Sequence, residues 1–203
     1  ELLAKRYQMV SKDKCNIYTT SFFNWGTSAG ASIYHPHYQV LTLPIIPRNI
    51  EHSLAGAEHY WKTHGQCVRC VVMKFDVKDG KRIVEQDKFS VAITPFISRK
   101  PFEVRILPKK HFPYFEKTPL PYLRAMARTL QSVLRRVKKH LNDPDFNFFI
   151  HSAPFRYEKY KYHHWHIEVV PKISIPAGFE LSTGIDINAT DPEPATAILR
   201  GRI

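Results

Sequence analysis

An apolar repeat in the second half of the chain constrains its fold more than any other feature. Seven apolar residues recur at alternating intervals of three and four, as one face of an amphipathic helix requires, and Asn142-Asp143-Pro144 ends the pattern. The seven are Leu120, Leu123, Ala127, Leu130, Leu134, Val137 and Leu141. A helix of this length must bury that face against a sheet or another helix.

Short runs rich in β-branched and aromatic residues predict strands on both sides of this helix. Three of the runs before it are split by turn residues, as in an antiparallel meander. Strands are predicted at 16–24, 38–46, 82–86, 89–95, 102–108, 146–151 and 163–171, and shorter helices at 2–10, 50–64 and near the end of the chain. The predicted class is α+β, an antiparallel sheet with one long helix packed on it.

The charge balance predicts an affinity for anions. Lys and Arg outnumber Asp and Glu 30 to 18, which gives a net charge of +12. Nucleic acid, acidic membranes and phosphorylated small molecules would all be attracted. The basic residues are spread along the sequence, with the densest group at 135–140, so charge alone does not choose among these partners.

The 203 residues are 43% hydrophobic, which predicts a folded chain. There is no run of about 18 apolar residues and no signal-peptide pattern at the start, which predicts a cytoplasmic protein without a membrane partner. The chain begins with Glu1 rather than Met, so we expect a processed piece of a longer protein.

Two of the three cysteines form the pair Cys67-Val-Arg-Cys70, which has the spacing of two thiolates in one zinc knuckle. Tetrahedral zinc needs two further ligands, and His111 and His164 are the candidates because each adjoins a predicted strand. A reduced pair without metal is the alternative. The remaining cysteine, Cys15, is expected to be a buried thiol.

The segment GTSAGASIYHPHYQ, residues 26–39, combines glycines and hydroxyls with two histidines. Its small residues can offer backbone amides and hydroxyl groups that cradle a phosphate. They are Gly26, Ser28, Gly30 and Ser32. Alternate residues of a strand share a face, so His35 and His37 would project in the same direction about 7 Å apart, as would His164 and His166.

A nucleophilic imidazole beside a phosphate cradle suits nucleotidyl transfer, in which the nitrogen attacks phosphorus to form a phosphoramidate. Gln39 lies on the same predicted face as His37 and can donate a hydrogen bond to a nonbridging oxygen. The order Asn24, loop and His35-Pro36-His37 is echoed by Asn147, loop and His164-Trp165-His166. Such an internal echo suggests duplication.

The segments NWGTSAGASIYHPHYQ, CVRC, PFEVRILPKKH, NFFIHSAPF, HWHIEVVP, AGFELSTG and PEPATAILR follow one another along the chain. Together they resemble the galactose-1-phosphate uridylyltransferases of the histidine triad superfamily, in the order of that family and over nearly the whole chain. The resemblance implies a histidine-triad-like fold. By this resemblance residues 1–50 are the C-terminal part of a first such domain, and residues 51–203 form a second one with the zinc site.

The resemblance also implies roles for single residues. His37 would be the nucleophile that carries the nucleoside monophosphate, while Gln39 and Ser32 would contact the transferred phosphoryl group. Asn24 and Gly30 match positions that bind nucleotide phosphates. His35 matches a ligand of a zinc site completed by upstream residues. Glu180, with Phe179 beside it, matches a residue that reaches the hexose of the partner subunit in a homodimer.

Two groups of proteins within this resemblance differ in the metal site of the second half of the chain. Bacterial members have an iron site on histidines matching His151, His164 and His166. The knuckle with His111 and His164 instead resembles the second zinc site of plant-type ADP-glucose phosphorylases, which transfer adenylyl groups.

The predicted function is therefore a sugar-1-phosphate nucleotidyltransferase that acts on a nucleotide sugar and a hexose 1-phosphate. An ADP-sugar phosphorylase or adenylyltransferase is the alternative. Because the first half of the family pattern is absent, the fragment alone is expected to lack part of the nucleotide pocket. A further alternative, from a different functional class, is an inactive, zinc-stabilised module that binds nucleotides or nucleic acid. The lack of an aromatic stacking motif beside the basic run counts against nucleic-acid binding.

Overall fold

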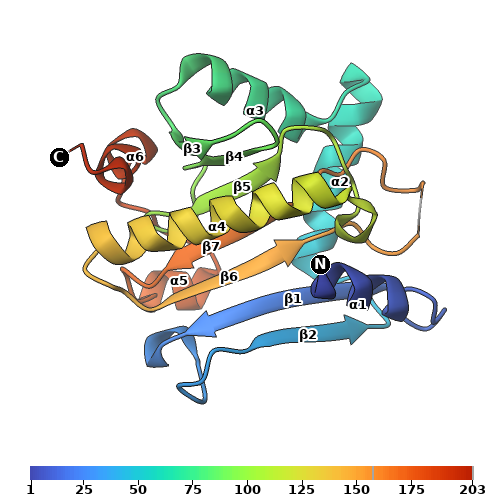
Figure 1. Cartoon of the computed structure of the whole chain (residues 1–203), viewed down its shortest axis with the longest axis horizontal. Coiled ribbons are helices and arrows are strands. Elements are labelled where there is room, and N and C mark those ends of the chain that lie inside the picture. The colour runs from blue at the N-terminus through green and yellow to red at the C-terminus, as the bar shows by residue number, and fades with distance from the viewer. Residues whose placement is uncertain (157, 203) are drawn as a thin grey trace.

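The described part of the chain, residues 1–156 and 158–202 of a computed structural model, forms one seven-stranded antiparallel sheet (Figure 1). The strand order is β2-β1-β6-β7-β5-β4-β3. The strands are β1 (Tyr18–Trp25), β2 (Tyr38–Leu43), β3 (Ile83–Gln86), β4 (Ser90–Ile93), β5 (Val104–Pro108), β6 (Phe146–His151) and β7 (His166–Pro171). Every neighbouring pair is antiparallel, and β3, β4 and β5 form the expected meander.

The predicted long helix is α4, and it packs on one face of the sheet (Figure 1). The helices are α1 (Leu2–Val10), α2 (Arg48–His64), α3 (Val68–Asp79), α4 (Leu120–His140), α5 (Gly178–Thr183) and α6 (Pro192–Arg200), with short 3-10 turns at Thr27–Ala29 and Phe115–Lys117. The predicted fold class, an antiparallel α+β protein with one long packed helix, is confirmed.

The buried stripe of α4 differs slightly from the predicted one. Ala125, Met126, Val133 and Val137 are its buried apolar residues. Leu130 and Leu134 pack against the core only partly, at the edge of the stripe. The buried face of α4 is therefore wider than the leucine repeat alone. Its centre is one residue earlier in the sequence than the centre of that repeat.

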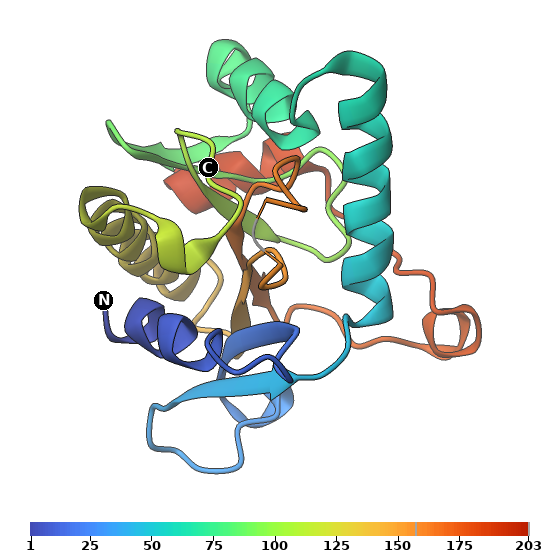
Figure 2. The ribbon, with the colours of Figure 1, turned by 90° about the vertical axis from the view of Figure 1, so that its right-hand side faces the viewer.

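The two faces of the sheet differ in chemistry because side chains alternate along each strand. Phe23, Phe148 and Ile167 form a hydrophobic core with Met126 and Val133 of α4. Strand register places a second set of side chains on the opposite face: Thr20, Asn24, Gln39, Arg105, Asn147, Phe149, His151, His166 and Glu168. In Figure 2, α4 and α2 lie on opposite sides of the sheet.

The sequence predictions for several elements need correction. The strand predicted at 163–171 begins only at His166, because the amides of His163 and Trp165 bond to the carbonyls of Tyr160 and Phe112 outside the sheet. Residues 68–79, for which no element was predicted, form α3, which ends at the left-handed Gly80. Cys15 is exposed rather than buried, because it lies in the turn after α1.

The predicted domain boundary at residue 50 does not divide the sheet. Ser21 to Trp25 of β1 pair with Phe146 to Ile150 of β6, so the first 50 residues and the remainder share one sheet. The assignment of these segments to two histidine-triad-like domains stays a prediction. Among the described residues, no helix is long and apolar enough to cross a membrane.

The side chain of Asp87 stabilises the turn between β3 and β4. Asp87 Oδ1 accepts hydrogen bonds from the Phe89 amide at 2.7 Å, the Ser90 amide at 2.7 Å and the Ser90 hydroxyl at 2.9 Å. We expect Asp87→Ala to lower the free energy of unfolding by about 1–2 kcal/mol, measured by urea denaturation, because these donors lose their acceptor. Asp87→Asn keeps an acceptor oxygen and should lose less.

This stabilisation should also depend on pH. Burial would raise the pKa of Asp87, but the hydrogen bonds from Phe89 and Ser90 lower it below its usual value. A depressed pKa gives stability that is present above the unfolded pKa of about 4 and lost as the pH falls through the folded pKa. The stability difference between wild type and Asp87→Asn should therefore shrink below about pH 4. A constant difference from pH 7 to pH 2 would contradict this account.

Candidate functional site

The segment with the two histidines leads into the edge strand β2. Tyr38 opens that strand opposite Phe23 of β1 and packs against its ring on the core side. Side-chain alternation therefore places Gln39 on the face opposite α4, and His37 lies immediately before the first residue of the strand. Pro36, which cannot donate to a ladder of hydrogen bonds, lies just before an edge strand, where proline is tolerated.

The ring of His37 is held by its own chain. Its Nδ1 lies 2.8 Å from the backbone oxygen of His35. A carbonyl oxygen can only accept a hydrogen bond, so Nδ1 carries the proton and Nε2 keeps its lone pair. The arrangement fixes the tautomer in which Nε2 can act as a nucleophile.

The glycine-rich loop between β1 and β2 is anchored by a carboxylate. Asp145 Oδ2 accepts hydrogen bonds from both the amide and the hydroxyl of Ser28, each at 2.7 Å. A Cβ on Gly26, whose φ is +83°, would lie 1.7 Å from Asp145 Oδ1, so only glycine fits there. The Ser28 amide, predicted as part of a phosphate cradle, is thus already engaged by Asp145.

The two asparagines of the internal echo meet directly. Asn24 and Asn147 are cross-strand partners in β1 and β6. The Asn147 amide nitrogen donates to Asn24 Oδ1 and to the Ala29 carbonyl, both at 2.8 Å. This pair ties the glycine-rich loop to the sheet beside His37.

A small cavity of about 250 Å³ lies against this loop. Asn24, Ser32 and His35 contribute to its lining, so the structure brings these three predicted residues together. Gly30 has a φ of +80° and open space where a Cβ would be. Phe179 and Glu180 lie on α5, which stands away from the sheet (Figure 2), so they are not part of the His37 site within one chain.

The four proposed zinc ligands converge. The ligand atoms of Cys67, Cys70, His111 and His164 all lie within 4.8 Å of one another. Cys70 Sγ is 3.3 Å from Nδ1 of each histidine. Cys67 caps the N-terminus of α3 and Cys70 lies in its first turn, whereas the histidines follow β5 and precede β7.

The surroundings of this cluster suit a metal ion. His111 Nε2 donates to the Lys161 carbonyl at 2.9 Å, which directs Nδ1 toward the sulfurs, as outer partners of metal-bound histidines do. A hydrogen bond from Cys70 lowers the pKa of Cys67, with further contributions from His111 and His164. Ligand atoms of a tetrahedral zinc ion are roughly 3.3–3.8 Å apart, from its bond lengths. The donor set of two sulfurs and two imidazoles fits such an ion.

A second group of possible metal ligands consists of His151, His166 and Glu168, also within 4.8 Å of one another. The rings of His151 and His166 stack with centroids 4.8 Å apart. His164, predicted as a third histidine of this alternative set, turns instead to Cys70. The reason is that β7 begins only at His166, so the two histidines do not follow strand alternation.

Glu168 was not predicted, and it is the acidic member of this group. Its carboxylate lies 3.4 Å from His151 Nε2, 3.3 Å from Arg99 and 3.7 Å from Arg105. Burial would raise its pKa, but the hydrogen bond from His151 and the charges of Arg105 and Arg99 lower it to about 2. It is therefore ionised at neutral pH and paired with cationic side chains.

Comparison with known proteins gives one consistent relationship. No protein-family model matches the sequence. The chain is 31% identical over 198 residues to an ADP-glucose phosphorylase of Arabidopsis thaliana, covering 97% of this chain and 55% of that protein. It is 29% identical over 209 residues to a galactose-1-phosphate uridylyltransferase of Thermotoga maritima, covering 98% of this chain and 65% of that protein.

Solved structures agree. The crystal structure of an Arabidopsis thaliana ADP-glucose phosphorylase with bound ADP-glucose matches with a TM-score of 0.90 at 30% identity, over 98% of this chain and 64% of that chain. A uridylyltransferase structure matches with a TM-score of 0.91 at 27% identity, over 98% and 65%. The chain thus spans between half and two thirds of the length of these relatives.

The antiparallel sheet, the long helix and the cysteine–histidine cluster define an α+β protein with a donor set that fits a metal ion. With the matches above, the relationship becomes specific. The chain belongs to the family of galactose-1-phosphate uridylyltransferases and ADP-glucose phosphorylases.

Proposed function

We propose that this chain carries the nucleophile of a sugar-1-phosphate nucleotidyltransferase, and that the nucleophile is His37. The observation that supports this most strongly is the 2.8 Å hydrogen bond between His37 Nδ1 and the His35 carbonyl, because it leaves the Nε2 lone pair available. Family membership supports the same reaction class.

The proposed reaction has two displacements. Nε2 of His37 attacks the α-phosphorus of a nucleotide sugar, and the bond from that phosphorus to the bridging oxygen breaks. A hexose 1-phosphate leaves with the bonding electrons while a nucleotidyl-histidine forms. A phosphate oxygen of a second acceptor then attacks the same phosphorus, and the imidazole leaves as the neutral ring.

The proposed intermediate carries a positive charge on its ring, because Nδ1 keeps its proton while Nε2 is bonded to phosphorus. The His35 carbonyl accepts the Nδ1 hydrogen bond and so stabilises that charge. Gln39, on the face of β2 opposite α4, is proposed to donate to a nonbridging oxygen. Asn24, Gly30 and Ser32 are proposed to bind the nucleotide phosphates.

The proposed metal is zinc, held by Cys67, Cys70, His111 and His164. Its proposed role is structural, since four protein ligands close a tetrahedral site and leave no position for substrate. His35 is proposed as a ligand of a second zinc site; among the described residues it joins no group of possible metal ligands.

Adenylyl transfer or phosphorolysis is the second candidate. The 31% identity with an ADP-glucose phosphorylase favours it, as does the pairing of a cysteine knuckle with His111 and His164. In that reaction inorganic phosphate, instead of a hexose 1-phosphate, would accept the nucleotidyl group. The chemistry at His37 would be the same.

An assay of the full-length protein separates these candidates. UDP-glucose with galactose 1-phosphate and ADP-glucose with inorganic phosphate are each supplied, and release of glucose 1-phosphate is followed. The pair with the larger kcat/KM identifies the nucleotide. If neither nucleotide sugar is cleaved, the proposed function is wrong and the reading as an inactive nucleotide-binding module gains support.

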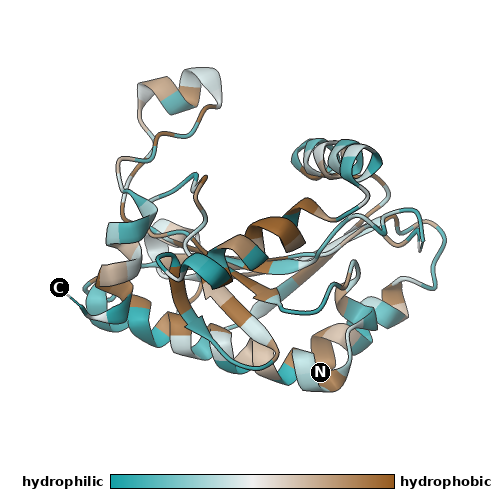
Figure 3. Ribbon diagram, turned by 90° about the horizontal axis from the view of Figure 1, so that it is seen from above, coloured by the Kyte–Doolittle hydropathy of each residue, from teal (hydrophilic) through white to brown (hydrophobic). Residues whose placement is uncertain are grey.

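The proposed homodimer rests on the arm around α5, defined here as residues 173–187. Figure 3 shows α5 standing apart from the sheet, with hydrophobic and hydrophilic residues mixed along it. Several large apolar side chains of the arm are exposed: Ile173, Ile175, Phe179, Leu181, Ile185 and Ile187. Contact with a second copy would bury them and bring Glu180 and Phe179 to the hexose of the partner subunit.

We expect Leu181→Asp to weaken this dimer by at least about tenfold in Kd, because it places a charge in the proposed contact. Sedimentation or light scattering over a range of concentrations measures the change. Ile97→Asp is a matched control, since both side chains are 77% exposed but Ile97 lies outside the arm. A dimer that is equally stable in both variants would contradict a role for the arm.

A further inference from the structure

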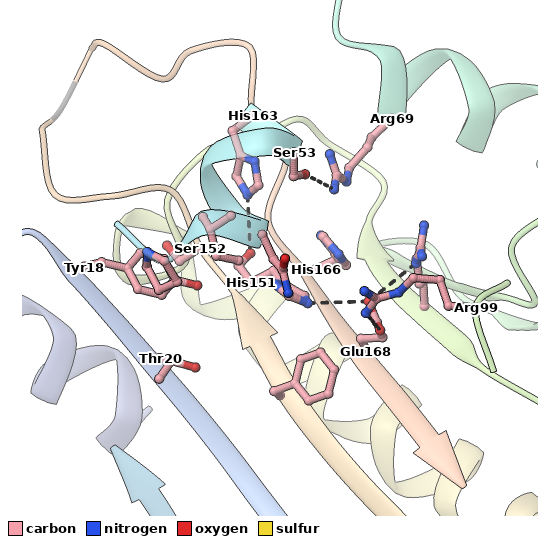
Figure 4. Close-up of a pocket in the computed structure, with 15 residues that line it drawn as sticks. Tyr18, Thr20, Ser53, Arg69, Arg99, His151, Ser152, His163, His166 and Glu168 are labelled. Carbon is pink, nitrogen blue, oxygen red and sulfur yellow. Dashed lines mark hydrogen bonds and ion pairs between the residues drawn. The ribbon is translucent and has the colours of Figure 1, made fainter. Parts of the chain in front are cut away.

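The face of the sheet opposite α4 contains a cavity of about 530 Å³ that the proposed reaction does not use (Figure 4). Its floor is formed by residues of β1, β6 and β7, and α2 and α3 contribute Ser53 and Arg69. A volume of this size lies within the range of small-molecule sites in proteins.

Positive charge dominates the lining of this cavity. Three arginines, Arg69, Arg99 and Arg105, contribute to it, together with the single carboxylate of Glu168. Arg99 and Arg105 both lie against Glu168, and Arg105 also donates to Glu103. Arg99 also lies 4.0 Å from Asp186, so Arg99 and Arg105 are both paired with acidic side chains, and Arg69 carries the positive charge of this lining for which the described residues form no ion pair.

Arg69 is the member of this group without an acidic partner in the described part of the chain. One of its Nη atoms donates to the Ser53 hydroxyl at 3.1 Å, and Figure 4 shows this contact at the rim of the cavity. A guanidinium has five N–H donors in a planar fork that matches two oxygens of a phosphate. Arg69 thus keeps most of its donor capacity for a ligand.

His163 adds an unsatisfied acceptor. Its side chain is only 3% exposed and contributes to the cavity lining. Its Nε2 lies 3.5 Å from the His151 carbonyl, whereas its Nδ1 has no hydrogen-bond partner among the described residues. Buried polar atoms are normally paired, so a ligand with a hydroxyl group would complete this one.

We propose that this cavity binds a phosphate group, of a phosphate monoester or of inorganic phosphate, through the guanidinium of Arg69. His163 Nδ1 accepts a hydrogen bond from a hydroxyl of the same ligand. The lining of the cavity includes Tyr18, Thr20 and Phe149 but neither Asn24 nor His37. Phe149 pairs with Phe22, two residues before Asn24, so the cavity ends about 7 Å along β1 from the level of Asn24.

The same cavity also contains His151, His166 and Glu168, whose ligand atoms are close enough to hold a cation. Two arginines already neutralise Glu168, and Arg69 adds an unpaired charge. A cation placed there would be repelled at short range by all three guanidiniums. The observations favour an anion, and cation binding becomes an outcome of the test.

The proposal is tested by calorimetric titration of the full-length protein with inorganic phosphate. Wild type is expected to bind with a Kd of about 1 mM or tighter, the range of a single well-placed anion site. Ser53→Asp places a carboxylate beside Arg69, where it competes with the phosphate, and should weaken binding by about tenfold or more. Ser53→Asn has a side chain of the same shape as Asp without the charge, and its phosphate affinity should stay within about threefold of wild type. Glucose 1-phosphate, titrated in parallel, distinguishes a monoester from free phosphate by its relative affinity.

Further variants keep the test decisive. Arg69→Gln should also weaken binding, and retained metal content and circular dichroism show that the fold persists in both variants. His37→Asn should bind phosphate as wild type does. The proposal is overturned if wild type binds no phosphate, if Ser53→Asp and Arg69→Gln bind it unchanged, or if His37→Asn abolishes binding. Binding of Mn²⁺ at this cavity in competition with phosphate would also overturn it. The results for Ser53→Asp and Arg69→Gln concern this cavity alone, so they separate a failure of this proposal from a failure of nucleotidyl transfer at His37.

Discussion

Replacing His37 by Asn is expected to lower kcat/KM for nucleotidyl transfer by about four orders of magnitude or more. The side-chain amide keeps part of the shape and polarity of the ring but has no nucleophilic lone pair, so the covalent step cannot occur. Steady-state release of glucose 1-phosphate from the preferred nucleotide sugar measures the loss. Binding of the nucleotide sugar should change far less, because the imidazole contributes mainly to the transition state.

His52→Asn provides the control for this substitution. His52 is exposed on α2 and takes no part in the proposed site, so its kcat/KM should stay within about twofold of wild type. If His37→Asn keeps a tenth or more of the wild-type kcat/KM, the nucleophile is another group.

Replacing Cys67 by Ser is expected to remove the bound metal and to lower the free energy of unfolding by at least about 3 kcal/mol. The cluster joins the start of α3 to the segments beside β5 and β7, and loss of a thiolate leaves the buried His164 and the half-buried Cys70 and His111 without their ion. Elemental analysis should find about one zinc fewer per chain in Cys67→Ser than in wild type, the ion held by the four convergent ligands. Urea denaturation measures the change in stability.

Cys15→Ser is the matched control, since Cys15 is an exposed thiol outside the cluster. It should retain both the metal and the stability of wild type. Iron that persists in Cys67→Ser and disappears in His166→Asn would contradict the account and place the metal at His151, His166 and Glu168.

Local signals in the sequence were sufficient for the long helix and most strands. The apolar repeat of α4 predicted its bounds closely, because a 21-residue amphipathic pattern has few alternatives. The stretch 68–79 was harder, since VRCVVMKFDV mixes β-branched residues with no clear helical period, and only Gly80 marked its end. The late start of β7 depends on hydrogen bonds from distant segments, which no local pattern records.

The candidate sites also differ in how much of each could be predicted from local sequence. His35, His37, Cys67 and Cys70 belong to short motifs whose spacing alone indicates their chemistry. The phosphate cavity instead combines residues of separate elements, among them Thr20, Ser53, Arg69 and His163, which no spacing connects. No sequence motif marks His163, and its unpartnered Nδ1 distinguishes it only in the folded structure. Its role depends on tertiary packing, which the sequence does not display.

The central claim, covalent catalysis by His37, is tested most directly by mapping the intermediate. The full-length protein is incubated with its preferred nucleotide sugar in the absence of acceptor, digested at alkaline pH and examined by mass spectrometry. We predict a nucleoside monophosphate on the peptide that contains His37, lost in acid because a phosphoramidate is acid-labile. A modification on any other peptide, or cleavage of the nucleotide sugar with no modified peptide in repeated trials, would contradict the account.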